Sequence, residues 1–289
     1  MSRILIQNAN IYDGTGGKPF RGCVCIDGAK IEKISRDMDT RGADEVVEAE
    51  GLALSPGFIN THSHMELEII KHPAMRSVIE QGITTECLGQ DGSSVAPLTD
   101  DLVQELADNM APLAGILDSP YPWRSFKEYM AAASAANPAA RFVGLVGHGT
   151  IRMNVMGNDN REPTPKERER MQSLLAQCME EGAKGLSLGL IYPPGSYANT
   201  RELIEMARVV AQYDGIMMVH MRSEKGELLE SVDEMEQIVR ASGVRLQISH
   251  HKALGKPNWG KVRQSMAKID ALQAAGFDLT FDQYPWTAA

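Results

Sequence analysis

Apolar and polar residues alternate in short runs over the first fifty residues, whereas the rest of the chain repeats short apolar runs separated by longer amphipathic stretches. The alternation runs from residue 3 to about residue 52 and is interrupted by glycine-containing turn signals at 13–17 and 27–28. Such a pattern is typical of small antiparallel strands. We therefore predict a small β-sandwich domain over residues 1–54.

From residue 55 the pattern predicts buried strands that alternate with helices. The predicted strands lie near residues 56–61, 83–89, 141–147, 185–190, 216–220, 245–250 and 278–283. The clearest helix begins at Pro165, after the N-cap residue Thr164, and is closed by Gly182. Strand–helix units repeated this often favour a parallel sheet that closes into a (β/α)8 barrel. We predict an α/β fold with a TIM-like barrel over residues 55–289, incomplete at about seven strands; a doubly wound open sheet is the alternative.

The composition is that of a soluble globular protein and argues against several kinds of partner. The chain has 289 residues, 43% of them hydrophobic, and 38 Asp and Glu against 29 Lys and Arg give a net charge of −9. This charge disfavours nucleic acid and anionic membranes, so we expect a small-molecule substrate. There is no run of 18 apolar residues, and the first residues lack a signal-peptide core, so we predict a cytoplasmic protein. The sequence leaves the oligomeric state open.

Histidines stand at the ends of three predicted strands. His62 and His64 follow the first apolar run, and His220 and His250 end the fifth and sixth. Side chains two residues apart in an extended chain point the same way, so His62 and His64 can bind one ion together. Because the strands of a barrel deliver their carboxyl ends to one rim, we expect these imidazoles to converge there. Zn²⁺, as one or two ions, suits such ligands best, and another divalent metal is the alternative.

A further metal ligand is expected from the second strand, where Glu86, Cys87 and Asp91 are candidates. Asp91 sits at the end of the strand, level with the histidines, and a carboxylate there could bridge two metals. Cys87 has the same alternation parity but lies deeper, where a structural thiol is the expected role. We favour Asp91 and keep Glu86 and Cys87 as alternatives.

Four residues near the same rim are predicted to bind substrate. Alternation returns Lys252 to the side of the sixth-strand histidine, where its ammonium can pair with a substrate anion. Tyr192 and Tyr284 each place a phenol just past a strand, where it can donate a hydrogen bond to a carbonyl or carboxylate. Arg222, with Glu224, lies on the loop after the fifth strand and could bind substrate or fix the loop.

Residues 56–64 read Pro-Gly-Phe-Ile-Asn-Thr-His-Ser-His, which resembles the signature of the amidohydrolase superfamily. Further segments resemble, in order, segments of the N-acyl-D-amino-acid deacylases (D-aminoacylases); they are residues 147–152, 185–195, 219–224, 248–253 and 282–287. Together these segments extend over nearly the whole chain. The resemblance implies a metal-dependent barrel beside a small β domain, with hydrolysis of an N-acyl-D-amino acid to a D-amino acid and a carboxylate.

The resemblance also implies roles for individual residues. It implies metal binding by the four histidines at the strand ends, and binding of the substrate carboxylate by Lys252 and Tyr284. Two positions depart from the family pattern: Asn60 stands where the family has Asp, and Asp91 stands where many D-aminoacylases place a metal-binding Cys. Asn60 is expected to alter the surroundings of the metal ligands.

The family takes its catalytic Asp from an eighth strand, whereas the sequence stops just after the seventh predicted strand. We therefore expect a truncated barrel with reduced or no activity, and we assign no catalytic residue. Asp282, at the end of the seventh strand, is the nearest substitute for the missing carboxylate.

Two alternative functions stay open from the sequence alone. One is another amidohydrolase, of the dihydroorotase, hydantoinase or isoaspartyl dipeptidase type. Those enzymes often use a carboxylated lysine at the end of strand four, whereas Lys184 precedes that strand here. The other is a non-catalytic homologue that keeps the metal site without a base.

Overall fold

The structure is a computed structural model that describes residues 2–117 and 121–286. Thr287, the last residue of the final family-like segment, lies outside the described residues. The chain divides into two compact units, Met1–Phe58 and Ile59–Ala289. In the part of the chain that is described, no helix is both long enough and apolar enough to cross a membrane.

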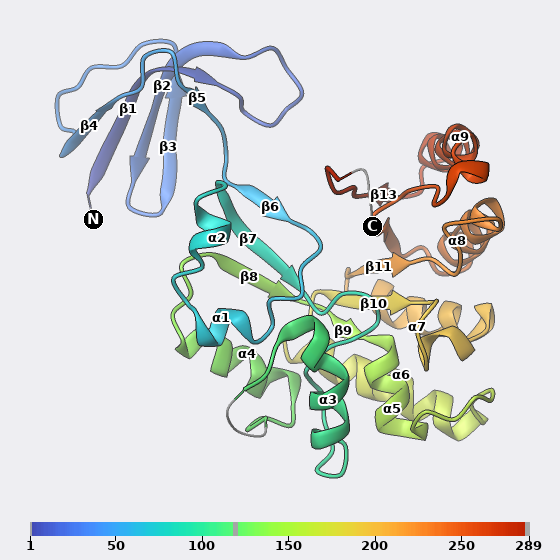
Figure 1. The fold of residues 1–289 in the computed structure, drawn as a ribbon. Coiled ribbons are helices and arrows are strands. Elements are labelled where there is room, and N and C mark those ends of the chain that lie inside the picture. The colour runs from blue at the N-terminus through green and yellow to red at the C-terminus, as the bar shows by residue number, and fades with distance from the viewer. Residues whose placement is uncertain (1, 118–120, 287–289) are drawn as a thin grey trace. The chain divides into compact units, whose positions relative to one another are not determined.

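The first unit contains one mixed five-stranded sheet in the order β3-β2-β1-β4, with β5 paired to β1 (Figure 1). Its strands are β1 (Arg3–Ile11), β2 (Phe20–Asp27), β3 (Lys30–Ser35), β4 (Glu45–Glu48) and β5 (Ala53–Leu54). The hairpin pairings are antiparallel, but β4 and β5 run parallel to β1. The described residues thus form a single sheet instead of the expected antiparallel sandwich. Alternation indicates which side chains of a strand share a face, but it does not fix the order of the strands or what covers them.

The second unit is built on an arc of parallel strands, which confirms the predicted TIM-barrel-like fold. The strands are β6 (Phe58–Asn60), β7 (Ile83–Leu88), β8 (Arg141–Gly144), β9 (Val146–Gly147), β10 (Gly185–Gly189), β11 (Ile216–His220), β12 (Arg245–Ile248) and β13 (Leu279–Phe281). β8 and β9 are two halves of one strand that is interrupted at Leu145. The seven predicted strands are therefore present. The barrel is not closed, because β6 and β13 end the two hydrogen-bonded series of the described strands.

Helices follow the strands and cover the outer side of the arc (Figure 1). They are α1 (Glu68–Lys71), α2 (Arg76–Ile79), α3 (Val103–Ala114), α4 (Phe126–Ala135), α5 (His148–Met156), α6 (Pro165–Glu180), α7 (Thr200–Gln212), α8 (Leu228–Ser242) and α9 (Lys261–Ala274), with 3-10 turns at Gly195–Tyr197 and Lys256–Asn258. Helix α6 begins as predicted: Thr164 Oγ1 accepts a hydrogen bond from the Glu167 backbone N–H, and the Glu167 carboxylate accepts one from Thr164 N–H. This reciprocal cap satisfies two donors that the helix itself leaves unpaired.

The interior of the arc is filled with side chains, so it is a core and not a channel. Every residue of β10 is buried, and Cys87, Leu145 and Met218 pack together inside the arc. A larger apolar cluster lies between β9–β13 and α5–α9. Because the interior is full, we look for the functional site at the rim formed by the carboxyl ends of the strands.

A side-chain contact links the two ends of the arc at that rim. Thr61, just after β6, donates a hydrogen bond from Oγ1 to Oδ2 of Asp282, just after β13, over 3.1 Å. The same oxygen accepts a hydrogen bond of 2.5 Å from Nε2 of Gln247, on β12. Asp282 therefore ties three strands together.

Candidate metal centre

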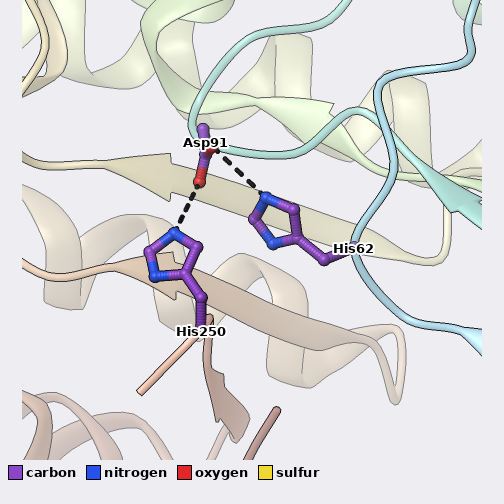
Figure 2. Close-up of side chains that lie close together, drawn as sticks. All are labelled: His62, Asp91 and His250. Carbon is purple, nitrogen blue, oxygen red and sulfur yellow. Dashed lines mark hydrogen bonds and ion pairs between the residues drawn. The ribbon is translucent and has the colours of Figure 1, made fainter. Parts of the chain in front are cut away.

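Four imidazoles surround the carboxylate of Asp91 at the rim. Nε2 of His62 and Nε2 of His64 each lie 3.3 Å from its Oδ2. Nδ1 of His220 lies 3.4 Å and Nε2 of His250 lies 3.6 Å from its Oδ1. Figure 2 shows His62 and His250 each in contact with the Asp91 carboxylate, His62 through Oδ2 and His250 through Oδ1. The five predicted ligands are thus brought together from segments that follow β6, β7 and β12 and from the last residue of β11.

The backbone is left-handed at two of these residues, which turns their side chains toward the cluster. Asp91 has φ +54° and His250 has φ +39°, and non-glycine residues rarely adopt this conformation. Each such residue costs about 1–3 kcal/mol, so the surroundings must hold it in place. Next to Asp91, the N–H of Gly92 donates to Oγ of buried Ser187 over 3.0 Å. At His250, the backbone N–H itself donates to Oδ1 of Asp282 over 2.5 Å.

Two glycines allow the Asp91 loop to reach this position. A Cβ on Gly189 would lie 1.9 Å from the carbonyl oxygen of Asp91, and a Cβ on Gly92 would lie 2.6 Å from the amide nitrogen of Gly189. Both contacts are with backbone atoms, which cannot move aside cheaply. Glycine at these positions is therefore a condition for placing the Asp91 carboxylate among the imidazoles.

The cluster strongly perturbs its own protonation. Burial alone would raise the pKa of Asp91, but the surrounding imidazoles outweigh it and hold that pKa well below its usual range. Burial alone would lower the pKa of His250, but the carboxylates of Asp91 and Glu224 raise it to about 9. The pKa of His64 is likewise raised, against the effect of burial, chiefly by its hydrogen bond to Asp91. The Asp91 carboxylate thus favours the protonated form of the His64 and His250 rings.

The donor set and its unsatisfied atoms fit a divalent ion. Two groups of donors lie within 4.8 Å of one another: His62, Asp91 and His250 form one, and His220, Glu224 and His250 form the other. Both nitrogens of His220 and Oδ1 of Asp91 are buried without a hydrogen-bond partner in the described structure, although Nδ1 and Oδ1 face each other. Such orphaned atoms cost free energy unless a cation or a water satisfies them. Imidazole nitrogens with carboxylate oxygens are suitable zinc ligands.

The other two candidates from the second strand lie outside the cluster. Glu86 is fully buried and accepts a hydrogen bond of 3.0 Å from Nδ2 of Asn60. Cys87 lies in the interior, with its Sγ 3.8 Å from Sδ of Met218. Burial raises the pKa of the Cys87 thiol to about 12, which keeps it protonated. Of the three candidates, Asp91 is the one that contacts the histidines.

A cleft of about 510 Å³ opens beside the cluster. Its lining residues are Asp91, Ile191, Tyr192, His220, Glu224, His250, Lys252, Leu254, Tyr284 and Trp286. Nζ of Lys252 lies 5.4 Å from the centre of the Tyr284 ring, and the Tyr192 ring packs edge-on against His220 with centroids 5.0 Å apart. Three of the four predicted substrate ligands therefore border the cleft. A larger hollow of about 860 Å³ lies along α5 and α6 and includes none of the candidate metal ligands.

Arg222, the fourth predicted substrate ligand, is not brought to the cleft lining. Its Nε donates to Oε2 of Glu234 over 2.8 Å, and its other nitrogens donate to the carbonyl oxygens of Ser196 and Ala198. These bonds connect the loop after β11 to the turn after β10 and to α8. Arg222 therefore fixes the loop, which was the second of its two expected roles.

Two supporting residues of the site were missed or given another role from the sequence. Glu66 is buried and accepts the N–H of Gly89 at Oε1 over 2.7 Å, which anchors the turn before Asp91. The same two-residue alternation that pairs His62 with His64 continues to Glu66, and this signal could have identified it. Asp282, expected as a substitute base, instead accepts three hydrogen bonds with its two carboxylate oxygens.

His148, at the start of α5, belongs to a separate buried group. Its Nε2 lies 2.8 Å from Oε1 of Glu202, and Arg152 binds both oxygens of the same carboxylate at 2.8 and 2.6 Å. All three side chains are almost completely buried. This group joins α5 to α7 and takes no part in the cluster around Asp91.

Sequence comparison identifies a matching protein family and three similar proteins. A family model described as "Amidohydrolase family" matches residues 45–285. Three proteins of Alcaligenes xylosoxydans xylosoxydans are similar: an N-acyl-D-glutamate deacylase is 35% identical over 98% of this chain, a D-aminoacylase 34% over 99%, and an N-acyl-D-aspartate deacylase 32% over 98%. The chain spans 57%, 57% and 56% of the lengths of these three relatives.

Solved structures of a D-aminoacylase and of an N-acyl-D-glutamate deacylase are also similar to this chain. A D-aminoacylase studied for its binuclear metal centre aligns with a TM-score of 0.88 and 34% identity, over 98% of this chain and 58% of that one. The N-acyl-D-glutamate deacylase of Bordetella bronchiseptica, complexed with zinc and a phosphonate inhibitor, aligns with a TM-score of 0.87 and 32% identity, over 99% of this chain and 59% of that one. A D-hydantoinase, 16% identical with a TM-score of 0.58 over 97% of this chain and 57% of that one, shares the fold alone.

Replacing Gly92 with Ala should damage the cluster, whereas the same change at Gly157 should not. Both glycines have positive φ, but a Cβ on Gly157 meets nothing within 4 Å. We expect Gly157→Ala to lower the free energy of unfolding by about 1–3 kcal/mol through backbone strain alone, because φ +65° with ψ −150° is a conformation that is largely confined to glycine. Gly92→Ala should cost about 2 kcal/mol more through the steric clash and should weaken zinc binding about tenfold or more. Denaturant unfolding and zinc titration measure both; equal effects of the two variants would contradict the role assigned to Gly92.

Replacing Asp91 should abolish tight metal binding, whereas replacing Cys87 should not. We expect Asp91→Asn to weaken zinc binding by about 100-fold or more, because it removes the charge on which the imidazoles converge. Cys87→Ala should leave zinc affinity within about twofold, since the thiol lies below the cluster. Zinc titration against a chromophoric chelator measures both affinities. A large loss in Cys87→Ala with a small one in Asp91→Asn would reverse the assignment.

Zinc binding should release protons at neutral pH. The pKa of His250 is raised to about 9, so its ring is protonated at pH 7 in the metal-free chain. The ring must lose that proton to bind an ion, and we therefore expect the release of about one proton or more per ion. The protonated ring also stabilises the metal-free fold below about pH 6.5, and this contribution disappears as the pH rises through about 9. Calorimetry in buffers of different ionisation enthalpy measures the release. His250→Gln should release fewer protons; no release by the unaltered chain would contradict the raised pKa.

Proposed function

The chain belongs to the amidohydrolase family, and from that premise we propose that its protein hydrolyses the amide bond of N-acyl-D-amino acids to a D-amino acid and a carboxylate. The observation that carries the proposal is the shared cleft: the imidazole–carboxylate cluster and the ammonium of Lys252 border the same hollow of about 510 Å³. An N-acyl amino acid has an amide carbonyl to be activated and a carboxylate to be recognised. The cleft offers a group for each.

The cluster provides the place for one or two zinc ions, with another divalent metal as the alternative. His62, His64, Asp91, His220 and His250 are the proposed ligands, and the two overlapping donor groups are compatible with either number of ions. A bound divalent ion supplies a lowered pKa for water and polarisation of a carbonyl. The similar deacylase complexed with zinc and the similar D-aminoacylase with a binuclear centre support this proposal.

Lys252 and Tyr284 are the proposed ligands of the substrate carboxylate. Lys252 is only 19% exposed at its side chain and lies against the Tyr284 ring. An ammonium and a phenol at one end of the cleft can bind an anion and place the amide over the cluster. Tyr192, which packs against His220, is the proposed hydrogen-bond donor to the acyl carbonyl.

Proton transfer is not assigned to a residue of this chain. Amide hydrolysis needs a group that takes a proton from water and gives one to the leaving amine. The sequence suggests Asp282 for this role, because it follows the seventh strand. Its two carboxylate oxygens, however, accept hydrogen bonds from Thr61, Gln247 and the backbone of His250. Its role is therefore to hold the rim together.

The structure disfavours a cyclic-amide hydrolase that relies on a carboxylated lysine. Lys184 is exposed and precedes β10, at the end of the strand opposite to the rim. The carboxyl end of β10 is formed by Leu188 and Gly189. No lysine of this strand can therefore bridge metals in the cluster.

The proposal is tested by stereospecific hydrolysis. We expect the zinc-supplemented protein to release free amino acid from N-acetyl-D-methionine but not from N-acetyl-L-methionine. His220→Ala should reduce this activity by about 100-fold or more, because it removes a proposed metal ligand. His72→Ala is the matched control: the His72 side chain is 67% exposed, pairs with Glu68 and is not a proposed ligand, so activity should be unchanged. Opening of hydantoin or dihydrouracil without release of D-methionine would favour the cyclic-amide alternative instead.

A further inference from the structure

One carboxylate outside the proposed ligand set touches both halves of the cleft. Oε1 of Glu224 lies 2.8 Å from Nδ1 of His250 and 2.5 Å from Nζ of Lys252. The Glu224 side chain is only 9% exposed, and Leu254 N–H donates to its backbone carbonyl oxygen. Glu224 is therefore held between a proposed metal ligand and the proposed ligand of the substrate carboxylate.

The contact with Glu224 favours one tautomer of the His250 ring. A carboxylate oxygen only accepts hydrogen bonds, so the 2.8 Å contact between Nδ1 and Oε1 of Glu224 is attractive when Nδ1 carries the hydrogen. Lys252, which also lies 3.0 Å from Nδ1, can instead donate to Glu224 and to the carbonyl oxygen of His250. When the ring is neutral, the lone pair is then on Nε2, the nitrogen that faces Asp91.

His250 is distinguished from the other three histidines by this support. The ring nitrogens that point away from Asp91 are Nδ1 of His62, Nδ1 of His64 and Nε2 of His220, and none of these three has a hydrogen-bond partner within the described residues. A carboxylate behind a metal-binding histidine orients the ring and raises its basicity. Among the four imidazoles, the described structure provides that support at His250.

We propose that Glu224 is a positioning residue that orients His250 and couples the binding of a carboxylate at Lys252 to the binding of metal by His250. The ammonium of Lys252 and the imidazole of His250 both contact Oε1 of Glu224. When a carboxylate ligand engages Lys252, Glu224 is left to the imidazole alone, which strengthens His250 as a metal ligand. By linkage, metal must then strengthen carboxylate binding by the same factor. The Lys252 half of this inference rests on the proposed function.

The test compares Glu224→Gln with Glu227→Gln, an identical substitution at an exposed position on the same loop. Zinc affinity and stoichiometry are measured with and without sodium acetate, which serves as a minimal carboxylate. For the unaltered chain and for Glu227→Gln, we expect acetate to raise zinc affinity about 5- to 50-fold. Glu224→Gln should bind the same number of ions about 10- to 100-fold more weakly and should lose the dependence on acetate.

Lys252→Met separates this coupling from direct binding of acetate to the metal. Direct binding needs no ammonium, so it would persist in Lys252→Met, whereas the proposed coupling would disappear. Thermal unfolding of each metal-free variant shows whether it is folded. If Glu224→Gln fails to fold, Glu224→Asp replaces it: a shorter carboxylate should keep part of the zinc affinity but not the acetate dependence.

Two results would overturn the inference. Unchanged zinc affinity and unchanged acetate dependence in Glu224→Gln would show that the carboxylate positions nothing. Loss of one ion per chain, with the affinity of the remaining ion unchanged, would make Glu224 a ligand of a second ion. Neither readout requires turnover, so the absence of deacylase activity would refute the proposed function while leaving the coupling between Glu224, His250 and Lys252 to be judged on its own.

Discussion

The attraction between one partly buried carboxylate and four imidazoles organises the rim of this protein. Asp91 lies within 3.6 Å of a ring nitrogen from each of four histidines, which come from three strand ends. The conformations at Asp91 and His250 are strained, so the packing and hydrogen bonds around them must offset that cost. Ser187, Gly189 and Asp282 supply this support without touching the open side of the cleft.

Much of this arrangement follows from rules that operate on short stretches of sequence. The seven barrel strands are predicted by apolar runs, because a strand buried on both faces has few polar residues. The histidines and Asp91 are predicted to meet because parallel strands in a barrel deliver their ends to one rim. The single sheet of the first unit was not predicted, since strand pairing is a long-range property that alternation does not encode.

The roles of individual polar residues were harder to predict, because each depends on a partner that is distant in sequence. Arg222 has the position of a substrate ligand, but Glu234 and two carbonyl oxygens occupy its guanidinium. Asp282 has the position of a base, but 221 residues separate it from its partner Thr61. A sequence shows which side chains reach the rim. It does not show which of them are already satisfied there.

Metal binding by the Asp91 carboxylate and the imidazoles, without a thiolate, is tested most directly by X-ray absorption at the zinc edge of the zinc-loaded protein. If Asp91 and the imidazoles hold the ion, the spectrum will show only nitrogen and oxygen neighbours, at about 2.0–2.2 Å. A sulfur neighbour at about 2.3 Å would mean that Cys87 reaches the metal, and it would contradict the account.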